Sequence, residues 1–348
     1  MSENLISNEI ACGKWTLGQK IGQGAYGVVY LAKGPDDTTA AVKVCRKDDT
    51  DPDRYERELR GARLYQSIPP EEGLVHLLDL VVCEWGFYTV MELADDEFGE
   101  CPGGSSEYRP KTLSRVIAGE KALPLTSALE LGITIANGLV TLQRHHLLHR
   151  DVKPGNIIYV RGKPVLSDIG LLVEESEAAS LVGTPGYVPP ENFTGASSDV
   201  YSLGLTLKAA SFGRSVEELD MGPTLEADTS DPLFPAWWRI LNKATHPDPS
   251  RRYHSAKALL KDLKSLHRRS FLSFGSRITS SAVQSATRIA GLVFFVLLLL
   301  ICGLIIWSKV HEYLRVEEEK AKARQSANKL MSNLKIQMRD FEKTMNGK

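Results

Sequence analysis

A stretch of 20 residues without a charged side chain, Ile289 to Ser308, constrains this chain more than any other feature. It contains the run Val293 to Ile301, in which every side chain is a large apolar one. As a helix the stretch would be about 30 Å long, which is the thickness of the hydrocarbon core of a bilayer. A buried core helix of this length normally carries a polar stripe. The sequence therefore predicts one transmembrane helix at residues 289–308.

The charges that flank this stretch predict its orientation. Arg268, Arg269, Arg277 and Arg288 precede it, and no acidic residue lies between them, whereas charges of both signs follow it. By the positive-inside rule, residues 1–288 should lie in the cytoplasm and the C-terminal tail outside. The first residues have neither a basic start nor an apolar run, so we do not expect a cleaved secretory signal.

Two further segments lie beside this stretch. Residues 268–288 are rich in Ser and Arg and poor in large apolar residues, which predicts a basic juxtamembrane linker that attracts anionic lipid. Residues 309–348 lack Pro and place apolar side chains alternately four and three residues apart from Ala327 to Met345. This seam fits a short coiled coil and a merely amphipathic helix equally well, so a homodimer through residues 327–345 is a hypothesis.

Composition limits what the rest of the chain can be. Its 43% apolar and 24% charged residues exclude global disorder. Lys and Arg number 42 against 43 Asp and Glu, so bulk charge gives no reason to expect nucleic acid as a partner. The five cysteines form no C-x-x-C pair, which argues against a structural zinc site and fits a reducing compartment. Short β-like stretches precede helical periodicity in residues 1–267, so a sheet-rich lobe should precede a helical one.

A glycine-rich turn joins two expected strands within residues 17–30. Gly22, Gly24 and Gly27 form a G-x-G-x-x-G pattern, whose glycines let the backbone close over phosphates. The pattern also occurs in dinucleotide-binding folds, but there it begins a helix. Here β-branched residues follow it, which favours a strand and a phosphate flap.

A single lysine lies inside the next apolar strand. Lys43 is flanked by alanine and valine, where an unpaired ammonium would be costly. It therefore needs anionic partners, and the candidates are ligand phosphates and a carboxylate of the following helix. Glu58 is favoured over Glu56 because its i+4 and i+7 neighbours are apolar or aromatic, as an inward helix face requires.

The most specific segment runs from His149 to Ile158. It places an acid, Asp151, and an amide, Asn156, five residues apart, and a second acid, Asp168, follows a short expected hairpin. Such a set supplies a base for a hydroxyl group and oxygen ligands for a Mg2+ ion that bridges phosphates.

In this order the motifs resemble those of the protein kinase family, and the resemblance covers Trp15 to His267. Lys153 after Asp151, together with Thr184, resembles the serine/threonine branch. The resemblance implies an α+β, two-lobed fold with a small β-rich N-lobe and a larger helical C-lobe, followed by the transmembrane helix and a short helical tail. The expected domains are an N-terminal extension at 1–14, a protein kinase domain at 15–267, the linker at 268–288, the membrane helix at 289–308 and the tail at 309–348.

The resemblance also implies roles for individual residues. Asp151 would accept the proton of the substrate hydroxyl, Lys153 would steady the transferred phosphoryl group, and Asn156 and Asp168 would hold Mg2+. The residues expected to bind ATP are Ile21, Gly22, Gly24, Gly27, Val29, Ala41, Lys43, Glu58 and, in the hinge that holds adenine, Glu92 and Ala94. Arg150, Asp199 and Arg252 are expected in structural roles, the last paired with Glu191 at the end of the substrate platform.

The expected activation segment runs from Asp168 to Glu191. Because Arg150 precedes the proposed base, the resemblance suggests control by a phosphate that this arginine binds. Glutamates in the segment could instead supply negative charge without modification. The candidate phosphosites are Ser176, Ser180 and Thr184.

Two positions depart from the family pattern, and one stretch interrupts it. Ile169 stands where the metal motif usually has Phe, and Pro189 stands where Ala is usual, and neither removes a catalytic group. The Gly-, Ser- and Pro-rich stretch Gly99 to Pro110 favours a flexible insertion after the hinge over a recognition loop.

The favoured function is that of an ATP-dependent serine/threonine protein kinase similar to bacterial single-pass membrane kinases, with autophosphorylation included. Its expected partners are protein substrates and membrane lipid, and its expected location is a bacterial plasma membrane. The alternative is a pseudokinase that binds ATP as a scaffold, although such proteins usually lack one of the catalytic residues. A small-molecule phosphotransferase is disfavoured by the segment Gly183 to Glu191, a peptide-substrate platform in the resembling family.

Overall fold

The chain forms two units, and each is described by itself. The structure, a computed structural model, describes residues 12–24, 27–47, 51–99, 107–120, 122–177, 183–191, 195–214, 216 and 231–345. The first unit covers Met1–Leu272 and the second Ser273–Lys348.

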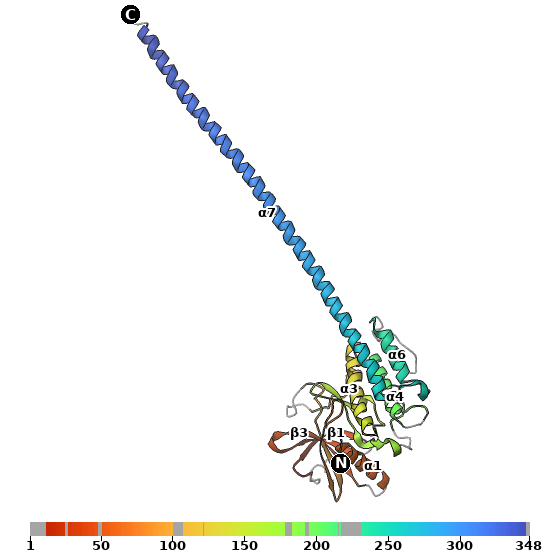
Figure 1. The fold of residues 1–348 in the computed structure, drawn as a ribbon. Coiled ribbons are helices and arrows are strands. Elements are labelled where there is room, and N and C mark those ends of the chain that lie inside the picture. The colour runs from red at the N-terminus through yellow and green to blue at the C-terminus, as the bar shows by residue number, and fades with distance from the viewer. Residues whose placement is uncertain are drawn as a thin grey trace. The chain divides into compact units, whose positions relative to one another are not determined.

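A five-stranded antiparallel sheet forms the N-terminal lobe of the first unit (Figure 1). The strands lie in the order β1 (Thr16–Gly24), β2 (Gly27–Lys33), β3 (Thr39–Arg46), β5 (Gly86–Met91) and β4 (Leu77–Cys83). Helix α1 (Pro52–Gln66) follows β3. It begins where the Asp51 carboxylate accepts a hydrogen bond from the Arg54 N–H. Pro52 suits the first turn because proline has no backbone N–H that would be left unpaired there.

The two faces of this sheet have different neighbours because side chains alternate along a strand. On β3, Val42 and Val44 pack in a cluster with Cys12 and Tyr88. Lys43 lies on the opposite face, where neighbouring Ala41 lines a cavity between the lobes. The sheet therefore presents one face to its own apolar cluster and the other to the candidate site.

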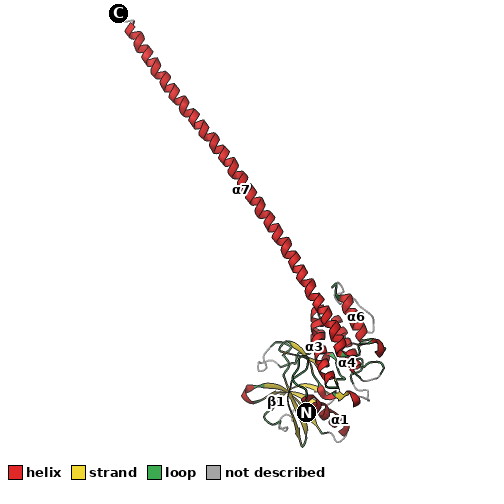
Figure 2. Cartoon of the chain, viewed as in Figure 1, coloured by secondary structure: helices red, strands yellow, loops and turns green. Residues whose placement is uncertain are grey.

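The second lobe is mainly helical, as the key of Figure 2 shows. Its core surrounds α3 (Leu125–Arg144), which packs against α4 (Ala196–Phe212). Ile135, Leu139 and Trp237 are fully buried there. Helix α4 ends at Gly213, whose φ of 63° is a left-handed conformation that glycine adopts without strain. The other helices are α2 (Leu113–Glu120) and α6 (Phe234–Ala244).

Short elements place the loops of the site. Two-stranded sheets are formed by β6 (Leu147–Leu148) with β9 (Val173–Glu174) and by β7 (Ile157–Val160) with β8 (Lys163–Leu166). Single 3-10 turns are η1 (Pro35–Asp37), η2 (Pro154–Asn156), η3 (Ile169–Leu171), η4 (Glu175–Glu177) and η5 (Pro249–Arg251). The β-rich lobe followed by the helical lobe confirms the two-lobed architecture that the sequence predicts.

Helix α7 runs from Ala256 to Met345. Its first turns belong to the first unit, where Leu259 and Leu263 are fully buried. Within the second unit, Leu297–Asn333 is long and apolar enough to cross a membrane, with a mean hydropathy of 1.6 and none of its apolar window buried. Helix α3 meets the same criteria among the described residues, but 61% of its window is buried in the core. The expected domain limits stay predictions.

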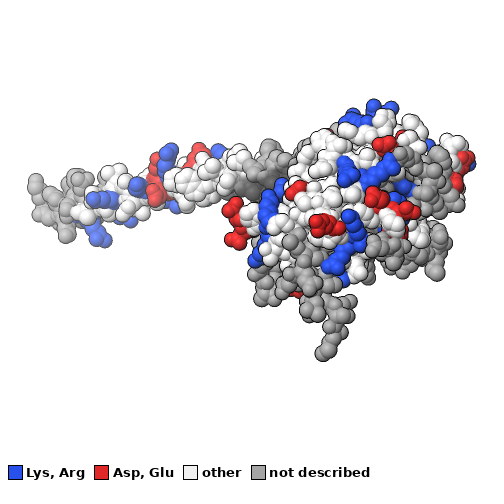
Figure 3. Space-filling view, turned by 90° about the horizontal axis from the view of Figure 1, so that it is seen from below, with Lys and Arg blue, Asp and Glu red and all other residues white. Residues whose placement is uncertain are grey.

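Charged side chains of both signs are interspersed over the face of the first unit that Figure 3 shows. This distribution agrees with the nearly equal numbers of basic and acidic residues in the chain.

Candidate active site

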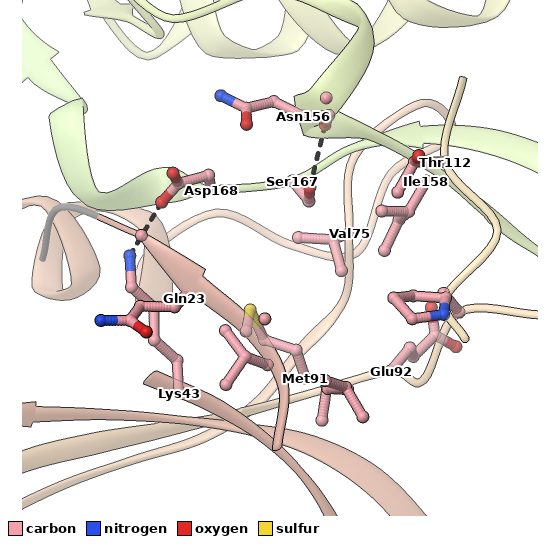
Figure 4. A pocket seen from close by; sticks show the side chains of 18 of the residues that line it. Gln23, Lys43, Val75, Met91, Glu92, Thr112, Asn156, Ile158, Ser167 and Asp168 are labelled. Carbon is pink, nitrogen blue, oxygen red and sulfur yellow. Dashed lines mark hydrogen bonds and ion pairs between the residues drawn. The ribbon is translucent and has the colours of Figure 1, made fainter. Parts of the chain in front are cut away.

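A cavity of about 250 Å³ lies between the two lobes (Figure 4). Strands β1, β2 and β3 supply one wall, the hinge after β5 another, and η2 with Ser167 and Asp168, which follow β8, the floor. Of the predicted ATP-binding and metal-binding residues, ten line it: Ile21, Gly22, Gly24, Val29, Ala41, Lys43, Glu92, Ala94, Asn156 and Asp168. Gly27 and Glu58 do not line it, and neither do Asp151 and Lys153.

The glycine-rich turn is a β-hairpin. Gly24 pairs with Gly27 across β1 and β2, so strand continues on both sides of the turn, as predicted. A Cβ atom on Gly27 would lie 2.6 Å from the Val44 carbonyl oxygen and 3.0 Å from Cys45 Sγ. Although Gly27 does not line the cavity, this close backbone approach requires glycine there.

Lys43 joins both lobes through two carboxylates. Its Nζ lies 3.1 Å from Glu58 Oε2 and 2.8 Å from Asp168 Oδ1, and Lys43 is 8% exposed. Burial opposes the charged form, but Asp168 and Glu58 outweigh it and raise the pKa of Lys43 above its ordinary value. Burial raises the pKa of Glu58, whereas Lys43 overcomes burial at Asp168 and lowers the pKa of that carboxyl. The structure thus places Glu58 against the lysine, while Glu56 is exposed.

Two glycines allow α1 to approach the metal motif this closely. A Cβ on Gly170 would lie 2.0 Å from Glu58 Oε1, and a Cβ on Gly61 would lie 2.8 Å from the Ile169 carbonyl oxygen. Any larger residue at 170 would therefore displace the glutamate. Sequence reasoning did not assign Gly170 a role, although its place after Ile169 in the metal motif was a usable signal.

A second network holds the catalytic loop. Asp151 Oδ1 accepts hydrogen bonds from the Thr184 N–H at 3.1 Å and hydroxyl at 2.6 Å. Asp151 Oδ2 accepts one from Asn156 Nδ2 at 2.7 Å and lies 2.9 Å from Lys153 Nζ. Lys153 also donates to Thr184 Oγ1 at 2.6 Å. The four residues therefore bring a carboxylate, an ammonium, an amide and a hydroxyl group to one point.

The three candidate phosphosites have different surroundings. The Thr184 hydroxyl is already bonded between Asp151 and Lys153, so a phosphate there would lie beside the carboxylate. Ser176 is exposed in η4, and Ser180 lies outside the described residues.

Buried structural contacts support both networks. Asp199, on α4, is fully buried and accepts hydrogen bonds from the N–H groups of His149 at 2.9 Å and Arg150 at 2.8 Å. Burial raises the pKa of Asp199. Arg252 donates to both carboxylate oxygens of Glu191, at 2.8 and 3.1 Å. These contacts fix the two ends of the segment that contains the catalytic loop and the substrate platform.

The donors at the cavity floor suit Mg2+. Asn156 Nδ2 is engaged by the backbone and side-chain oxygens of Asp151, which leaves the amide oxygen as the group able to bind a cation. Asp168 supplies a carboxylate. The preceding residue, Ser167, donates a hydrogen bond from its hydroxyl to the Asn156 carbonyl oxygen at 2.9 Å and so holds the two loops together. A Mg2+ site typically uses one or two carboxylates together with substrate phosphates, which this set matches.

Sequence reasoning missed residues of the cavity that follow the hinge. Tyr108, Pro110 and Thr112 line it, and Tyr108 is 4% exposed. The prediction of a flexible insertion at Gly99 to Pro110 is therefore wrong for residues 107–110, while residues 100–106 lie outside the described part. An aromatic residue beside a proline, directly after a Gly- and Ser-rich run, was the available signal.

Comparison with known proteins identifies the class. The family model "Protein kinase domain" matches residues 15–281, which is well over half of the chain. The chain therefore belongs to the protein kinase family.

Several bacterial kinases are similar to it. Serine/threonine-protein kinase PknK of Mycobacterium tuberculosis is 33% identical over 230 residues, which cover 62% of this chain and 19% of that protein. AfsK of Streptomyces griseus is 29% identical over 257 residues, covering 66% and 29%. PknA of Nostoc sp. is 25% identical over 289 residues, covering 75% and 48%. The matches thus span between about a fifth and a half of these relatives' lengths.

Proposed function

We propose that this chain is an ATP-dependent serine/threonine protein kinase. The observation that carries the proposal is the pair of ion contacts from Lys43 to Glu58 and Asp168, because it joins the strand lobe to the metal motif in the arrangement that phosphoryl transfer requires. The bacterial relatives named as serine/threonine kinases support the same branch.

The residues divide the work as follows. The substrate hydroxyl oxygen attacks the γ-phosphorus of ATP, its proton passes to Asp151, and the bond from the γ-phosphorus to the ADP oxygen breaks. Lys153 stabilises negative charge on the transferred group, and Lys43 holds the ATP phosphates. Mg2+, held by Asn156 and Asp168, would neutralise phosphate charge. Positioning a base contributes roughly 10²- to 10⁴-fold to the rate.

The alternative functions fit the site less well. A scaffold without catalysis would have no need for the intact set Lys43, Glu58, Asp151, Asn156 and Asp168. A small-molecule phosphotransferase would not need the platform up to Glu191, which Arg252 holds in place.

We also propose that residues 289–308 anchor the protein in a bacterial plasma membrane. The kinase domain, at residues 15–267, would lie in the cytoplasm, the basic linker 268–288 at the lipid surface, and the tail 309–348 outside. The apolar part of α7 and the arginines before it support this orientation. Homodimer formation through residues 327–345 belongs to the same proposal. Selective labelling of cysteines introduced at 345 and at 20 in intact cells tests the orientation, and labelling of both or neither contradicts it.

The first experiment measures transfer of the ATP γ-phosphate by the full chain in detergent. Wild type is compared with Asp151→Asn and Lys43→Met, and phosphorylated residues are mapped by mass spectrometry. We expect phosphoserine or phosphothreonine in wild type and none in either variant. ATP binding without any transfer to itself or to a general protein substrate would favour the scaffold.

A further inference from the structure

The residues after the hinge close one side of the nucleotide cavity. The Tyr108 hydroxyl donates a hydrogen bond to the Ala94 carbonyl oxygen at 2.8 Å. Gln19, on β1, donates from Nε2 to the Tyr108 carbonyl oxygen at 2.8 Å. Glu97 N–H donates to the Arg109 carbonyl oxygen at 2.8 Å. Tyr108 is therefore held from the hinge and from the strand lobe, and the next residue, Arg109, is held by Glu97.

This contact leaves the two backbone groups of Ala94 unequal. Its carbonyl oxygen accepts from Tyr108, whereas its N–H donates no hydrogen bond to any residue in the described part of the chain. Burial raises the pKa of Tyr108, so its hydroxyl keeps its proton and remains a donor. A base that enters beside Ala94 thus meets a free donor next to an acceptor that already uses one of its two lone pairs for Tyr108.

Purine bases differ in the hydrogen-bonding groups that they need from the Ala94 N–H and carbonyl oxygen. Adenine offers the ring acceptor N1 between its 6-amino donor and a C2–H group. N1 needs a hinge N–H and the amino group needs the carbonyl oxygen of another hinge residue, so the C2–H side needs nothing from the Ala94 carbonyl oxygen. Hypoxanthine and guanine offer the acceptor O6 beside the donor N1–H, which needs both a hinge N–H and a hinge carbonyl. A buried N–H left without an acceptor loses the hydrogen bond that it makes in water.

We propose that Tyr108 is a specificity-determining residue, which favours adenine over 6-oxopurine nucleotides by competing with the N1–H of the 6-oxopurine for the Ala94 carbonyl oxygen. The inference rests on the proposed function, because it assigns the cavity to a nucleotide. It adds a residue from the segment after the hinge to the base-recognition site.

The test measures dissociation constants of ATP, GTP and ITP for the full chain in detergent. ITP lacks the 2-amino group of guanine, so it separates the missing acceptor from a steric clash. In wild type we expect both GTP and ITP to bind at least about tenfold more weakly than ATP, the size of one lost buried hydrogen bond. ITP that binds wild type as tightly as ATP overturns the proposal without any variant.

The matched variants are Tyr108→Phe and Tyr253→Phe. Tyr108→Phe keeps the ring but frees the Ala94 carbonyl oxygen, so the affinities for ITP and GTP should rise about three- to tenfold while that for ATP changes less than about twofold. Tyr253→Phe removes the hydroxyl of another buried tyrosine, which donates a 2.8 Å hydrogen bond to Asp262. Neither of these residues lines the nucleotide cavity, so this variant should leave the ratios of the ATP, GTP and ITP affinities unchanged.

The outcomes distinguish this inference from the proposed function. If the wild-type chain does not bind ATP, both the proposed function and the role of Tyr108 are contradicted. Tight ATP binding with the same ATP to ITP ratio in wild type and Tyr108→Phe overturns the role of Tyr108 and leaves the kinase proposal intact.

Discussion

The two charged networks beside the nucleotide cavity are assembled in different ways. Asp151, Lys153 and Asn156 lie within six residues of one another, and Thr184 is the single distant member of their network. Lys43, Glu58 and Asp168 come from a strand, a helix and a loop, and 125 residues separate the lysine from the aspartate. The first network is local in sequence, whereas the second depends on how two lobes meet.

This difference determines how each network should fail. Asp199 holds the catalytic loop, so the local network should keep its geometry when one of its side chains is changed. Such a change should therefore lower the rate of the chemical step without disturbing the fold. The network between the lobes depends on the approach of α1 to η3, which Gly61 and Gly170 permit. A change of packing there should remove activity without touching any charged group.

The largest effect is expected in the local network, at the proposed base. Asp151→Asn keeps an oxygen that can accept from Thr184 but removes the proton acceptor, so kcat should fall by roughly 10²- to 10⁴-fold. The KM for ATP should change little, because Asp151 does not line the cavity. Steady-state kinetics with a peptide substrate measures both constants, and Glu56→Gln, at an exposed carboxylate, is the control. A large rise in KM with unchanged kcat would contradict the assignment.

Gly170→Ala tests the network between the lobes. Its Cβ would meet Glu58 Oε1 at 2.0 Å and displace the glutamate from Lys43, so kcat/KM for ATP should fall about 100-fold. Gly119→Ala is the matched control, because a Cβ there meets nothing within 4 Å. The double variant with Glu58→Asp, whose side chain is shorter, should recover part of the loss. Full activity of Gly170→Ala would contradict the conclusion that a Cβ at this position breaks the contact between Glu58 and Lys43.

The same contrast explains what the sequence allowed us to predict. Asp151, Asn156 and Asp168 belong to motifs with fixed spacing, and helical periodicity was enough to favour Glu58. Tyr108 was missed because its place is set by contacts with Gln19, 89 residues away, and with the hinge. No local pattern encodes such contacts.

The packing requirement at Gly170 was missed for the same physical reason. A glycine in a motif is visible in the sequence, but the oxygen atoms that exclude its Cβ belong to a helix more than a hundred residues earlier. The two-lobed order was predictable because strand and helix periodicities are local.

Thr184→Val should have a smaller effect on the local network. It keeps the shape of the side chain but removes the hydroxyl that bridges Asp151 and Lys153, so kcat should fall about tenfold. Thr184→Ser retains the hydroxyl and should stay within about twofold of wild type. Single-turnover phosphate transfer distinguishes this loss of chemistry from slow product release. Equal activity of the Val and Ser variants would remove the hydroxyl from the mechanism.

The smallest effect concerns stability at low pH in the network between the lobes. Lys43 lowers the pKa of Asp168 below its usual 3.8, so the folded chain binds this proton less readily than the unfolded chain. The stabilisation is complete above the unfolded pKa and is lost as the pH falls through the folded pKa. Urea unfolding of the full chain in detergent should show that wild type loses more stability between pH 5 and pH 2 than Asp168→Asn, which cannot titrate. Because the Asp168 side chain is 34% exposed, water screens the pair and the difference should be modest. Identical pH dependence in both proteins would mean that Asp168 contributes to the fold through shape rather than charge, and the contrast between the two networks would then apply to catalysis alone.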